Sequence, residues 1–285
     1  MLSLVALWIA ALQAPASSPS PSPRIEVSVA WEPRWDEYRY RFENDSSFGT
    51  PQLVPHFFAQ SYDASSQWLV VRARYQVARQ RWLTEFAMTP EVVTFGDDFD
   101  TFFQPGGDVV TVGTAGDVSL RSLRVAQRFL ALEQGPAVLF AEYAYRRDRA
   151  RFHPADRVEI HTKPPSTARE FITTRETTIS HVHEVRIGAE LEHRIGRAWR
   201  VDASLAAAPT AFARLVTQLP DKYPGRDIIF DAIVVAASGR LSLRREWPSW
   251  FVEVAADADR TWSYVSDRQF RREGYGVAAR VGIRR

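Results

Sequence analysis

The chain has 285 residues, of which 36 are Lys or Arg, 34 are Asp or Glu and none is Cys. The near-balance of charge argues against a nucleic-acid partner, and the missing cysteines exclude disulfides and thiolate metal sites. A hydrophobic content of 45% fits a soluble protein. It also fits a transmembrane β-barrel, because only every second residue of a barrel strand meets lipid.

The N-terminal residues have the pattern of an export signal followed by a linker. Leu2–Leu12 is an apolar run too short to span a bilayer, and small residues follow at Ala14-Pro15-Ala16. Residues 17–24 are rich in Ser and Pro. We therefore predict a signal peptide at 1–16, a flexible N-terminus at 17–24 and a β-barrel at 25–285. A buried N-terminal strand is the alternative, because no Lys or Arg precedes the apolar run.

From residue 25 onward, apolar and polar side chains alternate with a period of two, which is the pattern of strands with two unlike faces. In the last stretch, Tyr275, Val277 and Ile283 alternate with Gly276 and Arg280. The pattern predicts about ten strands. They are 25–44, 52–77, 81–96, 117–133, 137–153, 171–195, 198–215, 227–246, 250–264 and 273–284.

The connections between these strands are alternately short and long. Trp82, Trp199, Trp247 and Trp250 lie at or beside the short ones, where an aromatic girdle at the periplasmic interface would place them. We therefore predict an all-β fold: a single antiparallel up-and-down transmembrane β-barrel in the bacterial outer membrane. The short turns are 78–80, 134–136, 196–197 and 247–249; the long loops are 45–50, 97–116, 154–170, 216–226 and 265–272.

The alternation assigns an apolar row to the outside of each strand and a charged row to the inside. A barrel of about ten strands leaves an interior that side chains fill, so a wide pore and passive transport are not expected. Because an unpaired buried charge is costly, the inward charges should form ion pairs. They are Arg72, Arg74, Glu85, Glu142, Arg146, Glu184, Arg186, Glu190, Arg200, Asp202, Arg240, Arg244, Glu253, Asp257 and Arg280.

Three carboxylates, Asp97, Asp98 and Asp100, open the second long loop at the predicted extracellular rim. Neighbouring carboxylates favour proton sharing, which suits a pair that activates water. The alternative is an acidic loop start that caps turns or binds a cation loosely.

In strand order and in the alternation of short turns with long loops, the whole predicted barrel resembles the omptins. These are ten-stranded outer-membrane endopeptidases with an active site at the extracellular end. Asp98-Phe99-Asp100 occupies the place of the omptin Asp-x-Asp pair. In the fourth long loop, Asp221 takes the Asp position of the family's Asp-x-His pair, but Tyr223 takes the His position. The resemblance implies surface peptidase activity by Asp98, Asp100 and Asp221. Tyrosine, with an ordinary pKa of about 10, is a poor base, so a catalytically inactive barrel with a binding or envelope-structural role is the alternative.

Another histidine would have to supply the missing base. His153 and His161 lie at or in the third long loop, and His56 lies high on the second strand. His181 and His183 share a row with outward-facing residues, so their side chains should point away from the rim site.

The outer wall carries a second candidate site. Tyr145, Arg147 and Arg149 share the outward row of the fifth strand, and Arg175 and His181 that of the sixth. Arginine binds phosphates bidentately, and omptins are similar in having a lipopolysaccharide-binding patch on this wall. Snorkelling of arginine at the interface is the alternative.

Motifs for other chemistries are missing. The sequence has no His-Glu-x-x-His zinc site, Gly-rich phosphate loop or Gly-x-Ser-x-Gly elbow. We expect no cofactor and no metal. The expected partners are lipopolysaccharide and, for an active enzyme, a peptide or protein substrate.

Overall fold

The computed structural model describes residues 25–43, 57–77, 80–103, 109–134, 137–153, 156–161, 169–172, 176–218, 227–263 and 268–285, with Pro220 and Gly225. The predicted signal peptide and flexible N-terminus, 1–24, lie outside these residues. So do Asp221, Tyr223 and Arg175.

Every regular element in the described part of the chain is a β-strand. No helix there is long and apolar enough to cross a membrane. The strands are β1 (Ile25–Glu43), β2 (Phe57–Val77), β3 (Gln80–Met88), β4 (Val92–Phe103), β5 (Val109–Gln134), β6 (Ala137–Phe152), β7 (Asp156–His161), β8 (Arg169–Ile172), β9 (Glu176–Ile195), β10 (Trp199–Gln218), β11 (Asp227–Glu246), β12 (Trp250–Ser263) and β13 (Arg268–Arg284).

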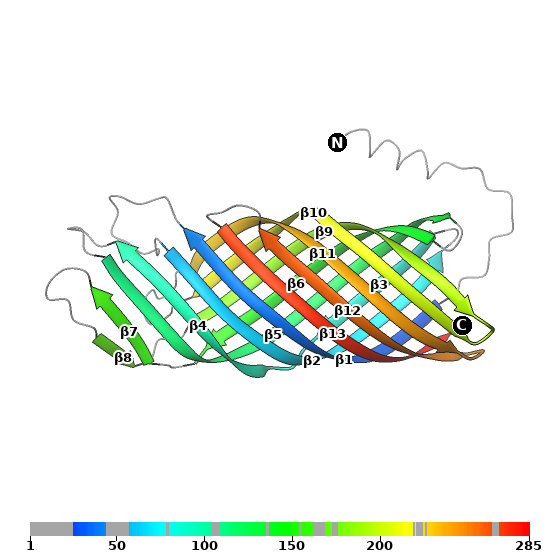
Figure 1. Ribbon diagram of the computed structural model, residues 1–285, viewed down its shortest axis with the longest axis horizontal. Coiled ribbons are helices and arrows are strands. Elements are labelled where there is room, and N and C mark those ends of the chain that lie inside the picture. Colours follow the sequence, from blue (N-terminus) through cyan, green and yellow to red (C-terminus); the bar gives the residue numbers. More distant parts are fainter. Residues whose placement is uncertain are drawn as a thin grey trace, which may run out of the picture.

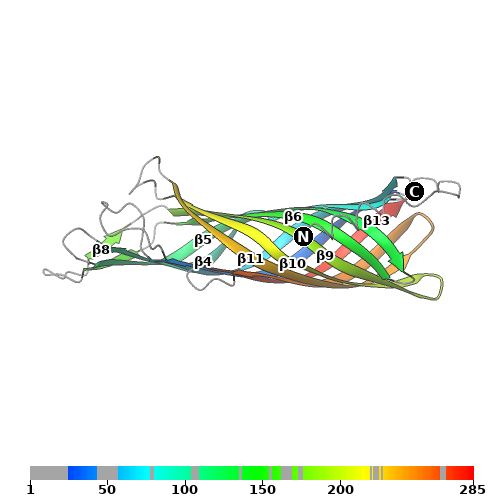
Figure 2. The same cartoon turned by 90° about the horizontal axis from the view of Figure 1, so that it is seen from above.

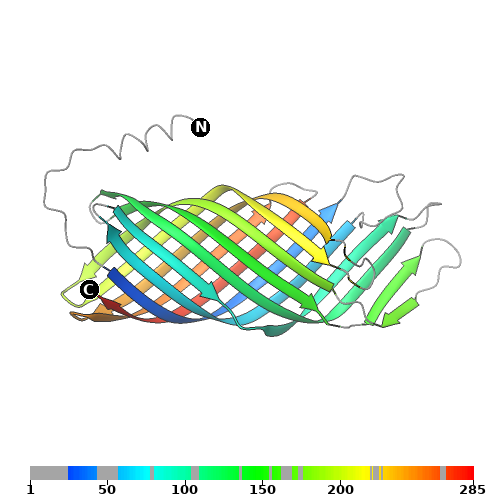
Figure 3. The same ribbon diagram turned by 180° about the vertical axis from the view of Figure 1, so that it is seen from behind.

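These strands close into an antiparallel barrel whose strands run obliquely around it (Figure 1, Figure 3). β1 pairs with both β2 and β13, and β3 pairs with both β2 and β5, which closes the ring. β4 also pairs with β2 and β5, so β3 and β4 share one position in the wall. β7 pairs with the first residues of β5, beyond the end of β6, and β8 pairs with β7, so neither adds a position to the ring. The described wall therefore has ten positions, and the predicted barrel is confirmed.

The wall position shared by β3 and β4 contains a break at Thr89-Pro90-Glu91. Pro90 has no N–H to give to a neighbouring strand. The pairing also shifts by one residue: Leu69 lies opposite Met88, but Tyr62 lies opposite Gly96. An extra residue of this kind is a β-bulge, which exchanges the two faces of the strand beyond it.

One end of the barrel, which we call the turn end, carries the start of β1, the end of β13 and the turns at 196–198 and 247–249. There the Ile25 N–H donates to the Arg285 carbonyl at 3.0 Å. Gly196 opens a tight turn with a φ of 66°, a conformation that costs glycine little. The opposite end is the loop end, where β7 and β8 lie beside the extended ends of β4 and β5 (Figure 1, Figure 2).

Two predicted loops are wrong in part, because strands extend into them. The predicted loop at 97–116 is mostly the paired ends of β4 and β5, and the predicted loop at 154–170 contains β7. The alternation continues through the first of these segments, with Phe95 and Phe99 outward and Asp98 inward. These segments are polar, which is typical of loops. A strand that extends beyond the membrane is also polar, because its outer row does not meet lipid.

The outer face of the wall is apolar along most of the barrel. Large hydrophobic side chains are exposed there, including Ile187 at 61%, Leu205 at 73% and Val254 at 54%. At the turn end, Trp199 and Trp250 are exposed, and Trp247 stacks on Trp250 with ring centroids 3.9 Å apart. This arrangement of an apolar band with an aromatic girdle is that of a membrane-spanning barrel.

The interior is filled by ion pairs, as predicted. All fifteen predicted inward charges line the lumen and each has an oppositely charged partner. Arg128 Nε lies 2.8 Å from Glu142 Oε2, and Arg74 Nη2 lies 2.7 Å from Glu190 Oε1.

Towards the loop end, aromatic rings replace the ion pairs, which the sequence did not predict. These rings belong to Tyr38, Tyr40, Phe42, Phe58, Tyr62, Phe152, Phe230 and Phe270. We call this group the aromatic floor, because it separates the charged lumen from the mouth of the barrel.

Candidate functional site

Asp98 and Asp100 lie on the inner face of β4, near the loop end. Asp98 is directly opposite Gln60 of β2, and Asp100 is opposite Phe58. The two aspartates are 4% and 2% exposed, whereas Phe99 between them is 45% exposed on the outer face. Residues two apart on a strand are about 7 Å apart along the chain and share a face. The carboxylates therefore form a short acidic row directed into the mouth.

The bulge at Thr89-Pro90-Glu91 decides which aspartates face inward. In β3 the buried row is Leu83, Glu85 and Ala87, all at odd positions, whereas in β4 it is Asp98 and Asp100, at even positions. Asp97, which the sequence grouped with them, is exposed on the outside.

A third carboxylate approaches this row from across the mouth. Gln60, opposite Asp98, donates from Nε2 to Glu176 Oε1 of β9 at 3.2 Å. Glu176 is 5% exposed. Glu176 is not identifiable from the sequence, because nothing in the local pattern shows that the start of β9 faces β2 across the barrel.

The aromatic floor borders the acidic row. Phe58, opposite Asp100, stacks on Phe230 with centroids 5.3 Å apart, and Phe42 stacks on Phe230 at 4.7 Å. The mouth therefore combines carboxylates with aromatic rings, which suits a cationic or mixed apolar ligand segment.

The described histidines face away from the acidic row. His153 lies on the outer face, where its Nε2 hydrogen-bonds to Ser119 Oγ, and Ser119 is opposite the exposed residues Val93 and Arg151. His181 and His183 also point outward, and His193 is exposed near the turn end. The side chains of His56 and His161 lie outside the described residues. So do Asp221 and Tyr223, whose roles stay predictions.

The outer-wall site is assembled from two neighbouring strands. The Tyr145 hydroxyl hydrogen-bonds to His181 Nδ1 at 2.9 Å, and the Tyr143 hydroxyl to His183 Nδ1 at 2.8 Å. Arg147 lies directly opposite His181. The structure thus brings together a phenol, an imidazole and a guanidinium near the loop end of the lipid-facing wall.

Arg149 continues this patch, two residues beyond Arg147 on β6. Among the described residues, no carboxylate pairs with Arg147 or Arg149. Arg214 of β10 also lies opposite His181, on the side away from β6. Its Nε is 2.7 Å from Asp231 Oδ1, with which it forms an ion pair. Tyr143 is a further hydrogen-bonding member of the patch that the sequence did not predict, although it shares the outward row with Tyr145. Arg175 lies outside the described residues.

No cluster of three or more His, Asp or Glu side chains suited to a metal ion occurs in the described part of the chain.

No known family profile matches the sequence, and no curated protein matches it. Among solved structures, the outer membrane protease OmpT from Escherichia coli matches with a TM-score of 0.62 at 11% identity, over 94% of this chain and 98% of that one. Ail of Yersinia pestis matches at 10% identity over 93% and 99% of the two chains, with a TM-score of 0.30. The toluene transporter TodX of Pseudomonas putida matches at 10% identity over 96% and 92%, with a TM-score of 0.29.

The TM-score of 0.62 shows a fold shared with OmpT, and at 11% identity the likeness concerns the fold alone. The chain has the fold of an omptin outer-membrane barrel, which confirms the predicted architecture and its outer-membrane location.

Proposed function

We propose that this barrel is a surface endopeptidase of the omptin type, with Asp98 and Asp100 holding the attacking water. The observation that carries the proposal is the acidic row itself: two buried carboxylates, two residues apart, share the inner face of β4. The row lies at the loop end, where an outer-membrane barrel meets the cell exterior.

The hydrolysis would proceed by attack of water on a peptide carbonyl. One carboxylate of the row orients the water and the other takes its proton, so that the oxygen bonds to the carbonyl carbon. The C–N bond then breaks, and the proton passes to the departing amine. Asp221, at the family's Asp position, would orient the missing base or bind a cationic side chain of the substrate.

The test is incubation of a basic peptide with the refolded protein and lipopolysaccharide in ¹⁸O-labelled water. Cleavage with one ¹⁸O in the new carboxylate supports attack by water, as mass spectrometry would show. Asp98→Asn and Asp100→Asn should each remove the cleavage. Asp97→Asn, on the outer face of the same strand, is the matched control and should keep it. An unchanged peptide with the wild-type protein refutes the peptidase proposal.

A binding barrel without peptidase chemistry is the second candidate. It is favoured by the four described histidines, which all face away from the acidic row, and by Tyr223 at the family's His position. Fluorescence anisotropy with the same labelled peptide separates the two. Binding that Asp98→Asn weakens, with no cleavage by the wild type, supports this second function.

We further infer that lipopolysaccharide is the lipid partner of the outer-wall patch. Arg147 and Arg149 present guanidinium groups near the loop end of the wall, where the phosphates of outer-leaflet lipid would lie. The Tyr145–His181 hydrogen bond holds two further polar groups beside them. Snorkelling alone would place arginines at this level, but would not require a tyrosine–histidine pair.

A further inference from the structure

The ion pairs of the lumen are unevenly distributed along the barrel. About midway, four guanidinium groups share two carboxylates, an excess of two positive charges. Arg72 and Arg124 pair with Glu85, and Arg240 and Arg280 pair with Glu253. We call these six side chains the central arginine layer: Arg72, Glu85, Arg124, Arg240, Glu253 and Arg280.

Arg280 is the least satisfied member of this layer. Its side chain is 1% exposed, and its Nη1 donates to Glu253 Oε1 at 2.6 Å. The same oxygen accepts from Arg240 Nη2 at 2.8 Å. Arg280 Nε and Nη2 are buried and have no hydrogen-bond partner among the described residues. A buried charged donor without a partner is strongly unfavourable, so these two nitrogens need a hydrogen-bond acceptor.

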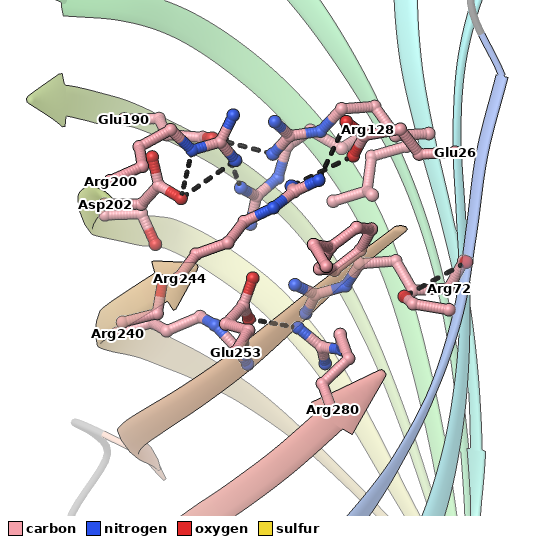
Figure 4. A pocket seen from close by; sticks show the side chains of 16 residues that line it. Glu26, Arg72, Arg128, Glu190, Arg200, Asp202, Arg240, Arg244, Glu253 and Arg280 are labelled. Atoms are coloured by element: carbon pink, nitrogen blue, oxygen red, sulfur yellow. Dashed lines mark hydrogen bonds and ion pairs between the residues drawn. The ribbon is translucent and has the colours of Figure 1, made fainter. Parts of the chain in front are cut away.

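A small cavity lies beside these donors. Its volume is about 50 Å³, and seven arginines against four carboxylates line it, among them Arg72, Arg240 and Arg280 (Figure 4). A cavity of this size and polarity holds a few waters or a small anion. Figure 4 shows the guanidinium groups of Arg240 and Arg280 on either side of Glu253.

On the side of the turn end, the cavity adjoins a larger hollow. A vestibule of about 580 Å³ there shares Glu26, Arg74 and Arg200 with the small cavity. Arg81, Arg194, Arg284 and Arg285 add positive charge to the vestibule, against Glu192 and Glu246. A cationic opening with low-dielectric walls concentrates anions.

Towards the loop end, aspartates join the lining of the lumen. Asp36, Asp257 and Asp259 form the next layer, where they bind Arg34 and Arg272. Their charge repels an anion, and their arginine partners are already engaged. The aromatic floor lies beyond them, so we expect the anion to bind no further than the central arginine layer.

We propose that the lumen binds a small inorganic anion between Arg72, Arg240 and Arg280, which it reaches from the turn end. The anion accepts hydrogen bonds from Arg280 and offsets the excess charge of the central arginine layer. This site is independent of the acidic row and of the proposed peptidase activity.

The direct test is a crystal structure of the refolded wild-type barrel grown in sodium bromide, with diffraction data at the bromine absorption edge. We expect an anomalous peak within hydrogen-bond distance of Arg280 Nη2. Ordered water alone in the cavity, or bromide bound only on the outer surface, overturns the proposal.

A solution measurement tests the same site through stability. Thermal unfolding in detergent is compared in sodium chloride and in sodium gluconate of equal ionic strength. At a chloride concentration ten times the Kd, the folding equilibrium constant of the wild type should rise about elevenfold. Arg280→Gln should lose this response.

Arg214→Gln is the matched control, because Arg214 is exposed on the outer wall beside Asp231. It should respond to chloride as the wild type does. An equal chloride response in Arg280→Gln and the wild type contradicts the proposal. If Arg280→Gln does not fold, the wild-type bromide map decides the question alone.

Discussion

Asp148 of β6 ties several elements of the barrel together just below the aromatic floor. It is 1% exposed and accepts a hydrogen bond from the Tyr38 hydroxyl at 3.1 Å and from Arg146 Nε at 2.9 Å. The hydroxyl groups of Ser122 and Ser180 also donate to it. One carboxylate therefore connects side chains of β1, β5, β6 and β9.

Replacing Asp148 by Asn keeps the shape of the side chain but removes its charge. Arg146 would then be left with Asp36, 3.5 Å away, as its remaining ionic partner among the described residues. Breaking a buried ion pair costs about 3–5 kcal/mol. Because the introduced amide would keep one acceptor oxygen and Asp36 remains, we expect a loss near the lower limit, about 3 kcal/mol.

The free energy of unfolding can be measured by urea titration in lipid vesicles, with tryptophan fluorescence as the signal. Asp231→Asn is the control, because Asp231 pairs with Arg214 on the exposed outer wall and should leave stability close to that of the wild type. If Asp148→Asn loses no more stability than Asp231→Asn, the inference that this buried network holds the barrel together is wrong.

Three further predictions follow from the mouth, the outer wall and the lumen. The double variant Asp98→Asn/Asp100→Asn should bind a basic peptide at least about tenfold more weakly by anisotropy, while Asp97→Asn binds as the wild type does. Arg147→Gln/Arg149→Gln should weaken lipopolysaccharide binding in a vesicle co-flotation assay, and Arg260→Gln, elsewhere on the wall, should not. Gly188→Ala should destabilise the barrel by about 1–3 kcal/mol in urea, because its Cβ would clash with the Leu205 carbonyl and the Phe140 ring. Gly239→Ala, whose Cβ would meet mainly the flexible Leu205 side chain, should cost less.

The barrel itself was predictable because each strand carries its own evidence. The alternation of Tyr275, Val277 and Ile283 with Arg280 shows which row meets lipid, and no distant residue is needed for that inference. The same local rule placed Asp98 and Asp100 near the loop end, although it assigned them to a loop.

The pairing inside the lumen was not predictable, because it depends on how the ring closes. Arg244 binds Glu26, 218 residues away in sequence, and Glu176 reaches Gln60 across the mouth. Such partners are fixed by the register of several strands at once. Likewise, the hydroxyl–imidazole contact between Tyr145 and His181 required the register of β6 on β9.

The break at Thr89-Pro90-Glu91 has a genetic consequence. Its one extra residue decides which residues of β4 face inward. Deletion of a single codon there would continue the inward and outward order of β3 into β4. Asp98 and Asp100 would then turn to the outside, and Asp97 and Phe99 would turn to the inside. The lumen of ion pairs below the break would keep its register. The chemical character of the mouth is therefore separable by one codon from the stability of the barrel that carries it.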